Sequence, residues 1–225
     1  MRTVMLTGAA GNLGRAVAAA FARAGENLAL LDVRRGDVQD GDRQLFIAVD
    51  LLDPASVQAA VGQAMQRFKR IDVLCNIAGG FRMGSPVHQT TDKDWNFLMD
   101  LNARTVLNTA RAVVPVMVKA GGGKIVNIGA FAAQKGAMQM GAYVASKSAV
   151  IRLTETMAAE LREQNINVNC VLPTIIDTPE NRAAMPDADP KRWVAPAALA
   201  EVVLFLASDA ARAIHGAALP VTGLS

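Results

Sequence analysis

The sequence predicts an α/β fold, a doubly wound parallel sheet of about seven strands. Two observations support this prediction. Short apolar runs alternate with helical patterns from one end of the chain to the other, and each run is apolar at nearly every position. Such runs are typical of strands buried on both faces, as in a parallel sheet covered by helices.

The expected elements follow one another without an internal repeat or linker, so residues 1–225 are expected to form one domain. The expected strands are Val4–Thr7, Leu28–Asp32, Leu45–Val49, Val73–Asn76, Lys124–Ile128, Asn167–Val171 and Ala217–Val221. The expected helices are Asn12–Ala24, Pro54–Phe68, Asp92–Lys119, Ala142–Gln164 and Pro196–Ala207.

Composition and charge exclude several classes of protein. The chain is 52% hydrophobic, yet it has no uninterrupted apolar run long enough to span a membrane, so no membrane partner is expected. The net charge of +3 comes from dispersed residues, which argues against nucleic-acid binding. The first residues enter a strand at once and leave no room for a signal peptide, so we expect a cytoplasmic protein.

Metal and disulfide chemistry are not expected either. His88 and His215 lie far apart in the sequence and neither has a spaced partner ligand, so no metal site is predicted. Cys75 and Cys170 each lie within an apolar run, which indicates reduced, buried thiols.

A glycine-rich turn follows the first strand, in the order Thr7-Gly8-Ala9-Ala10-Gly11-Asn12-Leu13-Gly14. Glycines at such a turn let backbone N–H groups approach a pyrophosphate and let the next helix pack closely on the sheet. The position after the first strand of an alternating pattern makes this a strong signal for a dinucleotide, with Gly8, Gly11, Asn12, Leu13 and Gly14 as binding residues.

The second strand ends in Asp32, where a carboxylate binds the adenosine ribose hydroxyls and repels a 2′-phosphate. NAD(H) is therefore preferred over NADP(H). Arg34 and Arg35 follow closely and could hold that phosphate, although we favour their being solvated loop charges. Asp50, after the third strand, is a candidate for the adenine edge or an ordinary loop residue.

Tyr143 is the one tyrosine of the chain, and it is followed at i+4 by Lys147 near the expected start of a helix. Residues at this spacing share a helix face. An ammonium about 4 Å away, at an effective dielectric of about 20, would lower the phenol pKa from about 10 toward working pH. The pair is a weak motif by itself and could equally be a surface helix pair.

Taken together, these motifs resemble the short-chain dehydrogenase/reductase family over nearly the whole chain. The motifs that carry the resemblance are the glycine turn, Asn76-Ile77-Ala78-Gly79, Asn102, Tyr143-x-x-x-Lys147 and the stretch from Pro173 to Thr178. The resemblance implies a single Rossmann-type domain and hydride transfer at a nicotinamide cofactor.

The resemblance also implies residue roles. Tyr143 would donate or accept the proton, Lys147 would lower its pKa and hold the nicotinamide ribose, and Asn102 would position a water beside the lysine. The residues expected along the cofactor are Asn76, Ala78, Gly79, Pro173, Ile176 and Thr178. The segment 173–196, rich in proline and charged residues, would cover the substrate.

The chain departs from the family pattern at two positions. Asn12 occupies a usual glycine position, and we expect the turn to survive because asparagine tolerates positive φ. Ala130 occupies the position of the family's substrate-orienting serine, in the loop after the fifth strand. Loss of that hydroxyl is expected to impair ketone reduction most, because the hydroxyl stabilises the developing alkoxide.

Three explanations for Ala130 stay open: a reaction that needs no second donor, a substitute donor such as Gln134 or Gln139, or no catalysis. The first is favoured by a narrower resemblance to the dihydropteridine reductases, which also carry alanine there. That resemblance rests on Ala78-Gly79-Gly80-Phe81 and on the segment Leu172 to Trp193. It implies a planar pterin-like or quinonoid substrate packed against Phe81.

The sequence therefore predicts an NAD(H)-dependent oxidoreductase acting on a small molecule. The alternatives are a general carbonyl or hydroxyl oxidoreductase of the 3-oxoacyl or ketone reductase type, and a non-catalytic protein that senses the dinucleotide or serves as a scaffold. A homodimer or homotetramer is expected through the two long helices, Asp92–Lys119 and Ala142–Gln164, which carry surplus apolar surface.

Overall fold

Seven parallel strands form one sheet in the computed structural model, which describes residues 1–225. The strands are β1 (Thr3–Thr7), β2 (Asn27–Asp32), β3 (Gln44–Ala48), β4 (Val73–Asn76), β5 (Gly123–Ile128), β6 (Ile166–Pro173) and β7 (Ala218–Val221). Their order is β3-β2-β1-β4-β5-β6-β7, and every neighbouring pair is parallel. The predicted fold class is confirmed. The strand order reverses between β1 and β4, where such sheets bind ligands.

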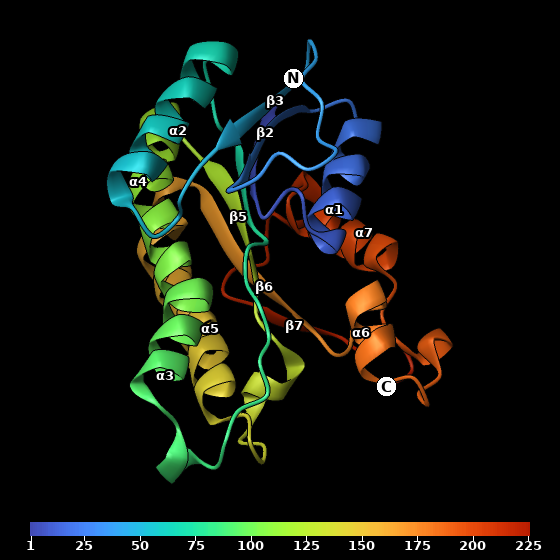
Figure 1. Ribbon diagram of the computed structural model, residues 1–225. Coiled ribbons are helices and arrows are strands. Elements are labelled where there is room, and N and C mark those ends of the chain that lie inside the picture. The colour runs from blue at the N-terminus through green and yellow to red at the C-terminus, as the bar shows by residue number, and fades with distance from the viewer.

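Helices cover both faces of the sheet, as Figure 1 shows. They are α1 (Asn12–Arg23), α2 (Pro54–Phe68), α3 (Asp92–Met99), α4 (Thr105–Ala120), α5 (Gly141–Leu161), α6 (Pro179–Ala184) and α7 (Pro196–Leu206). Helices α2, α4 and α5 lie on one face, whereas α1 and α7 lie on the other (Figure 1). No helix combines the length and the apolar character needed to cross a bilayer.

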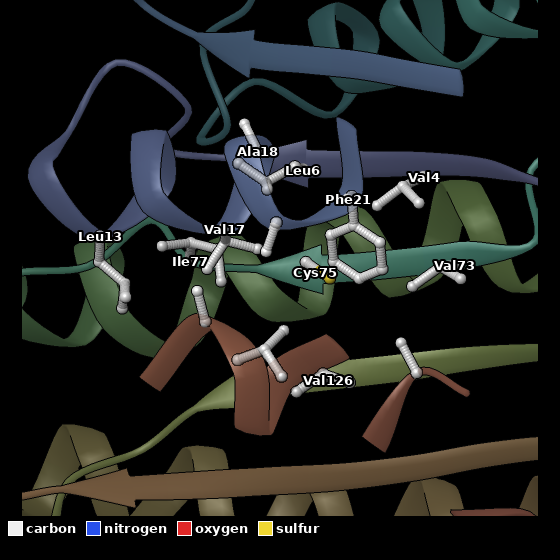
Figure 2. Packing of buried hydrophobic residues seen from close by; sticks show 14 of the residues in the cluster. Val4, Leu6, Leu13, Val17, Ala18, Phe21, Val73, Cys75, Ile77 and Val126 are labelled. Carbon is white, nitrogen blue, oxygen red and sulfur yellow. The ribbon is translucent and has the colours of Figure 1, made fainter. Parts of the chain in front are cut away.

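The alternation of side chains along β1 divides the core into two layers. Leu6 packs with Val17 and Phe21 of α1, on the face that α1 and α7 cover (Figure 2). Met5, the neighbour of Leu6 in the chain, packs on the opposite face with α2 and α4. Both faces of β1 are therefore buried, which explains why the strand is apolar along its length.

The predicted helix Asp92–Lys119 is interrupted in the structure. Helix α3 ends at Met99, a π-helical turn spans Asp100–Arg104, and α4 begins at Thr105. A π-helical turn accommodates an extra residue and is frequent at functional sites. The predicted continuous helix is therefore wrong at Asp100–Arg104, and this turn contains the candidate site residue Asn102.

Candidate active site

A cavity of about 700 Å³ opens at the carboxyl ends of the central strands. Its wall is formed by residues that follow β1, β4, β5 and β6, together with the first turns of α5. Leu13, Gly79, Ala130, Tyr143 and Lys147 all line it. The fold thus brings the glycine turn, the alanine at the usual serine position and the Tyr143–Lys147 pair to one cavity, although they are far apart in sequence.

Tyr143 lies in the first turn of α5 and its ring faces the cavity. The Phe81 ring meets it edge to face, with 4.9 Å between ring centroids and 87° between ring planes. Burial raises the pKa of the phenol to about 12. The hydroxyl therefore keeps its proton at neutral pH, which suits a proton donor.

Lys147 lies one turn further along α5, where it is buried in the wall of the cavity. Its Nζ donates a hydrogen bond to the Ile128 carbonyl oxygen, 2.8 Å away, at the end of β5. Burial lowers the pKa of this ammonium to about 8. The prediction that Lys147 lowers the pKa of Tyr143 finds no support here, because burial is the influence that raises the pKa of the phenol. The role of Lys147 stays a prediction.

Asn102 reaches the same place from the π-helical turn. Its Nδ2 donates to the Gly80 carbonyl oxygen at 3.1 Å and its Oδ1 accepts from the Gly80 N–H at 2.9 Å. A Cβ at Gly79 would lie 2.9 Å from Asn102 Oδ1 and 3.0 Å from Lys147 Nζ. Glycine at this position therefore leaves room for Asn102 and Lys147 to lie close together.

Ser146 completes this cluster and was missed by the sequence analysis. Asn102 Nδ2 donates to Ser146 Oγ at 3.0 Å, and that hydroxyl donates to the Tyr143 carbonyl oxygen at 2.8 Å. The π-helical turn is thereby tied to the first turn of α5. The sequence signal for this link was only that a serine directly precedes the lysine of the motif. The structure shows that this serine is buried.

The Asn76 side chain is directed into the sheet and not into the cavity. Its Nδ2 donates to Asn127 Oδ1 at 2.8 Å, and its Oδ1 accepts from Thr109 Oγ1 at 2.8 Å. Asn127 in turn donates to Thr154 Oγ1 at 2.8 Å. The Asn76 side chain therefore joins β4 to β5 and α4. The prediction that Asn76 lies along the cofactor then concerns its backbone.

The glycine turn is compact and needs glycine at two positions. Gly8 has φ +67°, and a Cβ at Gly14 would come 2.0 Å from the Gly8 carbonyl oxygen. Gly11 has φ −72° and precedes α1. Asn12 is the first residue of α1 and has no positive φ, so the tolerance of asparagine for positive φ is not needed here. The turn accepts asparagine there because the position is helical.

The N-terminus of α1 fits a dinucleotide. No side chain caps it and its first turn has no acidic residue, so its N–H groups remain available to an anion such as a pyrophosphate. Asp32 ends the neighbouring strand β2, and its Oδ2 accepts from the Ala10 N–H at 3.0 Å. This hydrogen bond places the carboxylate beside the turn.

Of the other candidate cofactor residues, Asp50 and Thr178 have structural roles of their own, and Pro173 and Ile176 line the cavity. The Asp50 carboxylate accepts from the Leu52 N–H at 2.9 Å, in an exposed turn. Thr178 caps α6 by accepting from the Asn181 N–H at 3.3 Å. Pro173 ends β6 and lines the cavity, as does Ile176.

The two glutamines considered as substitute donors lie outside the cavity. Gln134 is exposed and its amide donates to the Phe131 carbonyl oxygen at 3.4 Å. Gln139, also exposed, has φ +59° and lines a separate hollow of about 20 Å³ beside Tyr143. The structure gives no support to either glutamine as the second donor, because neither lines the 700 Å³ cavity.

The segment 173–196 contacts the glycine turn through α6. Glu180 Oε2 accepts from Asn12 Nδ2 at 2.7 Å, and Asn12 Oδ1 accepts from Arg15 at 2.7 Å. Met185, at the end of α6, lines the cavity. The departure at Asn12 thus supplies a polar contact between the dinucleotide turn and the segment expected to cover the substrate.

Comparison with known proteins agrees with this geometry. A family model described as short chain dehydrogenase matches residues 2–189. The protein belongs to the short-chain dehydrogenase/reductase family. It is 34% identical to the D-threitol dehydrogenase of Mycolicibacterium smegmatis over 239 residues, covering 99% of this chain and 92% of that protein. The chain is thus an oxidoreductase of this family, as its motifs predicted.

Two solved structures of the family share the whole fold. Carveol dehydrogenase from Mycobacterium avium in complex with NAD has a TM-score of 0.89 and 27% identity, covering 99% of this chain and 96% of that one. A NAD⁺-bound xylitol dehydrogenase has a TM-score of 0.90 and 28% identity, covering 99% and 98%. Both structures contain a nicotinamide dinucleotide, in agreement with the cofactor class expected here.

Proposed function

We propose that this enzyme uses NAD(H) to interconvert a secondary alcohol and the corresponding ketone. The observation that carries the proposal is that Tyr143 and Lys147 both line the cavity, with Asn102 beside Lys147 at Gly79. The three relatives described above are named for alcohols: threitol, carveol and xylitol. Their names support an alcohol or ketone as the substrate of this chain.

In the oxidative direction, the alcohol carbon gives up hydride and its hydroxyl gives up a proton, so the products are ketone, NADH and H⁺. The nicotinamide, when bound, takes or supplies the hydride. Tyr143 takes the proton in oxidation and donates it in reduction. Lys147 lines the cavity next to Tyr143, and Asn102 is hydrogen-bonded to Ser146 in the same turn of α5.

NAD(H) is proposed over NADP(H) because the Asp32 carboxylate lies beside the turn, where it would repel a 2′-phosphate. Asp32 occupies the end of β2. Arg35 pairs with Asp40 at 2.8 Å and lies over the Phe46 ring, 4.8 Å from its centroid. These contacts support the expectation that the Arg35 guanidinium does not bind a 2′-phosphate.

A planar pterin-like or quinonoid substrate is the second candidate. One observation favours it, the Phe81 ring beside Tyr143, against which a flat ring would pack. The matches described above give this candidate no support, because they are named for alcohols. We therefore prefer the alcohol and ketone reaction.

A homodimer or homotetramer is proposed through α4 and α5. These helices form an apolar surface groove of about 380 Å³, which includes Val106, Ala110, Val114 and Met157. Such a groove suits the same helices of a second copy. A monomeric mass by light scattering would exclude this assembly.

Steady-state turnover tests the proposed function. With NAD⁺ we expect the purified enzyme to oxidise secondary alcohols, and with NADH to reduce the matching ketones, with a clear preference over NADP(H). Turnover of quinonoid dihydropterin alone would establish the second candidate in its place. NADH binding without turnover of any alcohol, ketone or quinonoid compound would exclude both.

Ala130→Ser is expected to raise kcat/KM for ketone reduction by about tenfold to a hundredfold, because the new hydroxyl adds a hydrogen bond to the developing alkoxide. Ala130 lines the cavity with an extended backbone, φ −157° and ψ 143°, at the usual serine position. Steady-state reduction kinetics measure the gain. Ala132→Ser is the matched control, since Ala132 lines the same cavity two positions on. Equal effects of the two serines would contradict the assignment.

A further inference from the structure

Several large apolar side chains line the cavity. Among them are Phe81, Met83, Phe131, Met140 and Met185. Phe81 is 57% exposed and Met83 is 55% exposed, so large apolar side chains face solvent at the cavity. Exposed apolar surface that is gathered at a cavity is typical of a site for an apolar ligand.

The polar side chains of the wall are few and largely engaged. Thr174 Oγ1 donates to the Thr222 carbonyl oxygen at 2.9 Å and lies 2.8 Å from Ser225 Oγ. Asn181 Nδ2 donates to the Ile176 carbonyl oxygen at 2.8 Å. Apart from Tyr143 and Lys147, the only polar side chains that line the cavity are Thr174, Asn181 and Ser225. These three have little hydrogen-bonding capacity left for a substrate.

A polyol requires more than this wall supplies. Each of its carbons carries a hydroxyl, and each hydroxyl buried without a partner weakens binding by about tenfold. An aliphatic body loses nothing on leaving water and gains contact with the methionines, whose flexible thioethers adapt to different shapes. The wall thus selects against the polyols for which two of the relatives are named.

We propose that the substrate is an apolar secondary alcohol or ketone whose only polar group is the one that reacts at Tyr143. Its aliphatic or alicyclic body lies against the wall of Phe81, Met83 and Met185, and Phe81 packs beside both the body and the Tyr143 ring. This inference rests on the proposed function and narrows it to one substrate class.

A series of alcohols with matched carbon number tests the proposal with the whole enzyme and NAD⁺. We expect kcat/KM for 2-hexanol and cyclohexanol to exceed that for a hexitol by about a hundredfold or more. A preference for the hexitol would overturn the inference and leave the proposed function standing. If the enzyme binds NADH but oxidises neither the apolar alcohols nor the hexitol, both the inference and the proposed function are wrong.

Variants locate the preference on the wall. Met83→Gln and Met185→Gln are expected to raise KM for 2-hexanol by about tenfold with little change in kcat, because a polar amide replaces apolar contact. Met138→Gln is the control: Met138 is 85% exposed and does not line the cavity. Unchanged KM in both wall variants, or an equal rise in the control, would overturn the assignment. Thermal unfolding of each variant checks that the fold is intact.

Discussion

Tyr143→Phe is expected to lower kcat by about a hundredfold to ten-thousandfold while leaving the dissociation constant of NADH nearly unchanged. The substitution removes only the hydroxyl. Ring packing against Phe81 is kept, because the phenylalanine ring presents the same edge and face. Steady-state kinetics and NADH fluorescence titration measure the two quantities.

The two directions of the reaction should respond differently to pH in the parent enzyme. A phenol with a pKa of about 12 holds its proton throughout the neutral range, as ketone reduction requires. Alcohol oxidation requires the ionised phenol, whose fraction grows with pH, so the oxidative rate should rise with pH. Retained turnover in Tyr143→Phe, or an oxidative rate that falls as pH rises, would contradict the role of Tyr143 as proton donor and acceptor.

Most of the fold was predictable because the pattern that specifies it is local. A strand buried on both faces must be apolar along its length, and Val73–Asn76 was predicted with the bounds that the structure has. The π-helical turn at Asp100–Arg104 was not predictable in this way. One extra residue hardly changes the helical periodicity of a long segment, and what holds the turn are contacts of Asn102 with Gly80 and Ser146, which belong to other elements.

The sequence predicted which residues gather at the candidate site, but not where their side chains point or what they bind. Motif order brought Tyr143, Lys147 and Ala130 to one cavity, because the carboxyl ends of parallel strands meet at one edge. The i,i+4 spacing gave only the shared helix face. It could not show that the Lys147 ammonium, on a flexible four-carbon chain, binds the Ile128 carbonyl oxygen of a different element.

Lys147→Met is expected to abolish most activity and to stabilise the fold. The ammonium is buried, with a single hydrogen bond to the Ile128 carbonyl oxygen, and burial lowers its pKa from the usual 10.5 to about 8. Keeping that charge in the folded state costs up to about 3 kcal/mol, whereas the freed carbonyl costs about 1 kcal/mol. A net gain of about 2 kcal/mol raises Tm by about 4–8 °C. Calorimetry measures the gain. We expect kcat to fall by about a hundredfold or more, because the ammonium expected to hold the nicotinamide ribose is lost.

The pH dependence of that gain follows from the direction of the pKa shift. Between pH 8 and 10.5 the unfolded chain binds a proton at Lys147 that the folded chain has lost, so the parent becomes more stable as pH rises through this window. Below about pH 8 both states are protonated and the cost of the charge is fully present. The advantage of Lys147→Met should therefore be constant below about pH 8 and shrink toward pH 10.5.

Lys124→Met is the matched control for the lysine substitution. Lys124 also has a pKa lowered by burial, but it lies near the start of β5, away from the cavity, and its Nζ donates to Asn167 Oδ1 at 2.6 Å. Its loss should leave kcat unchanged and should stabilise the fold less, because Lys124 is only partly buried and its ion–dipole contact is lost. If Lys147→Met unfolds at a lower temperature than the parent, the Ile128 hydrogen bond outweighs the cost of burial. That result would contradict the prediction that Lys147 lowers the stability of the fold while it serves activity.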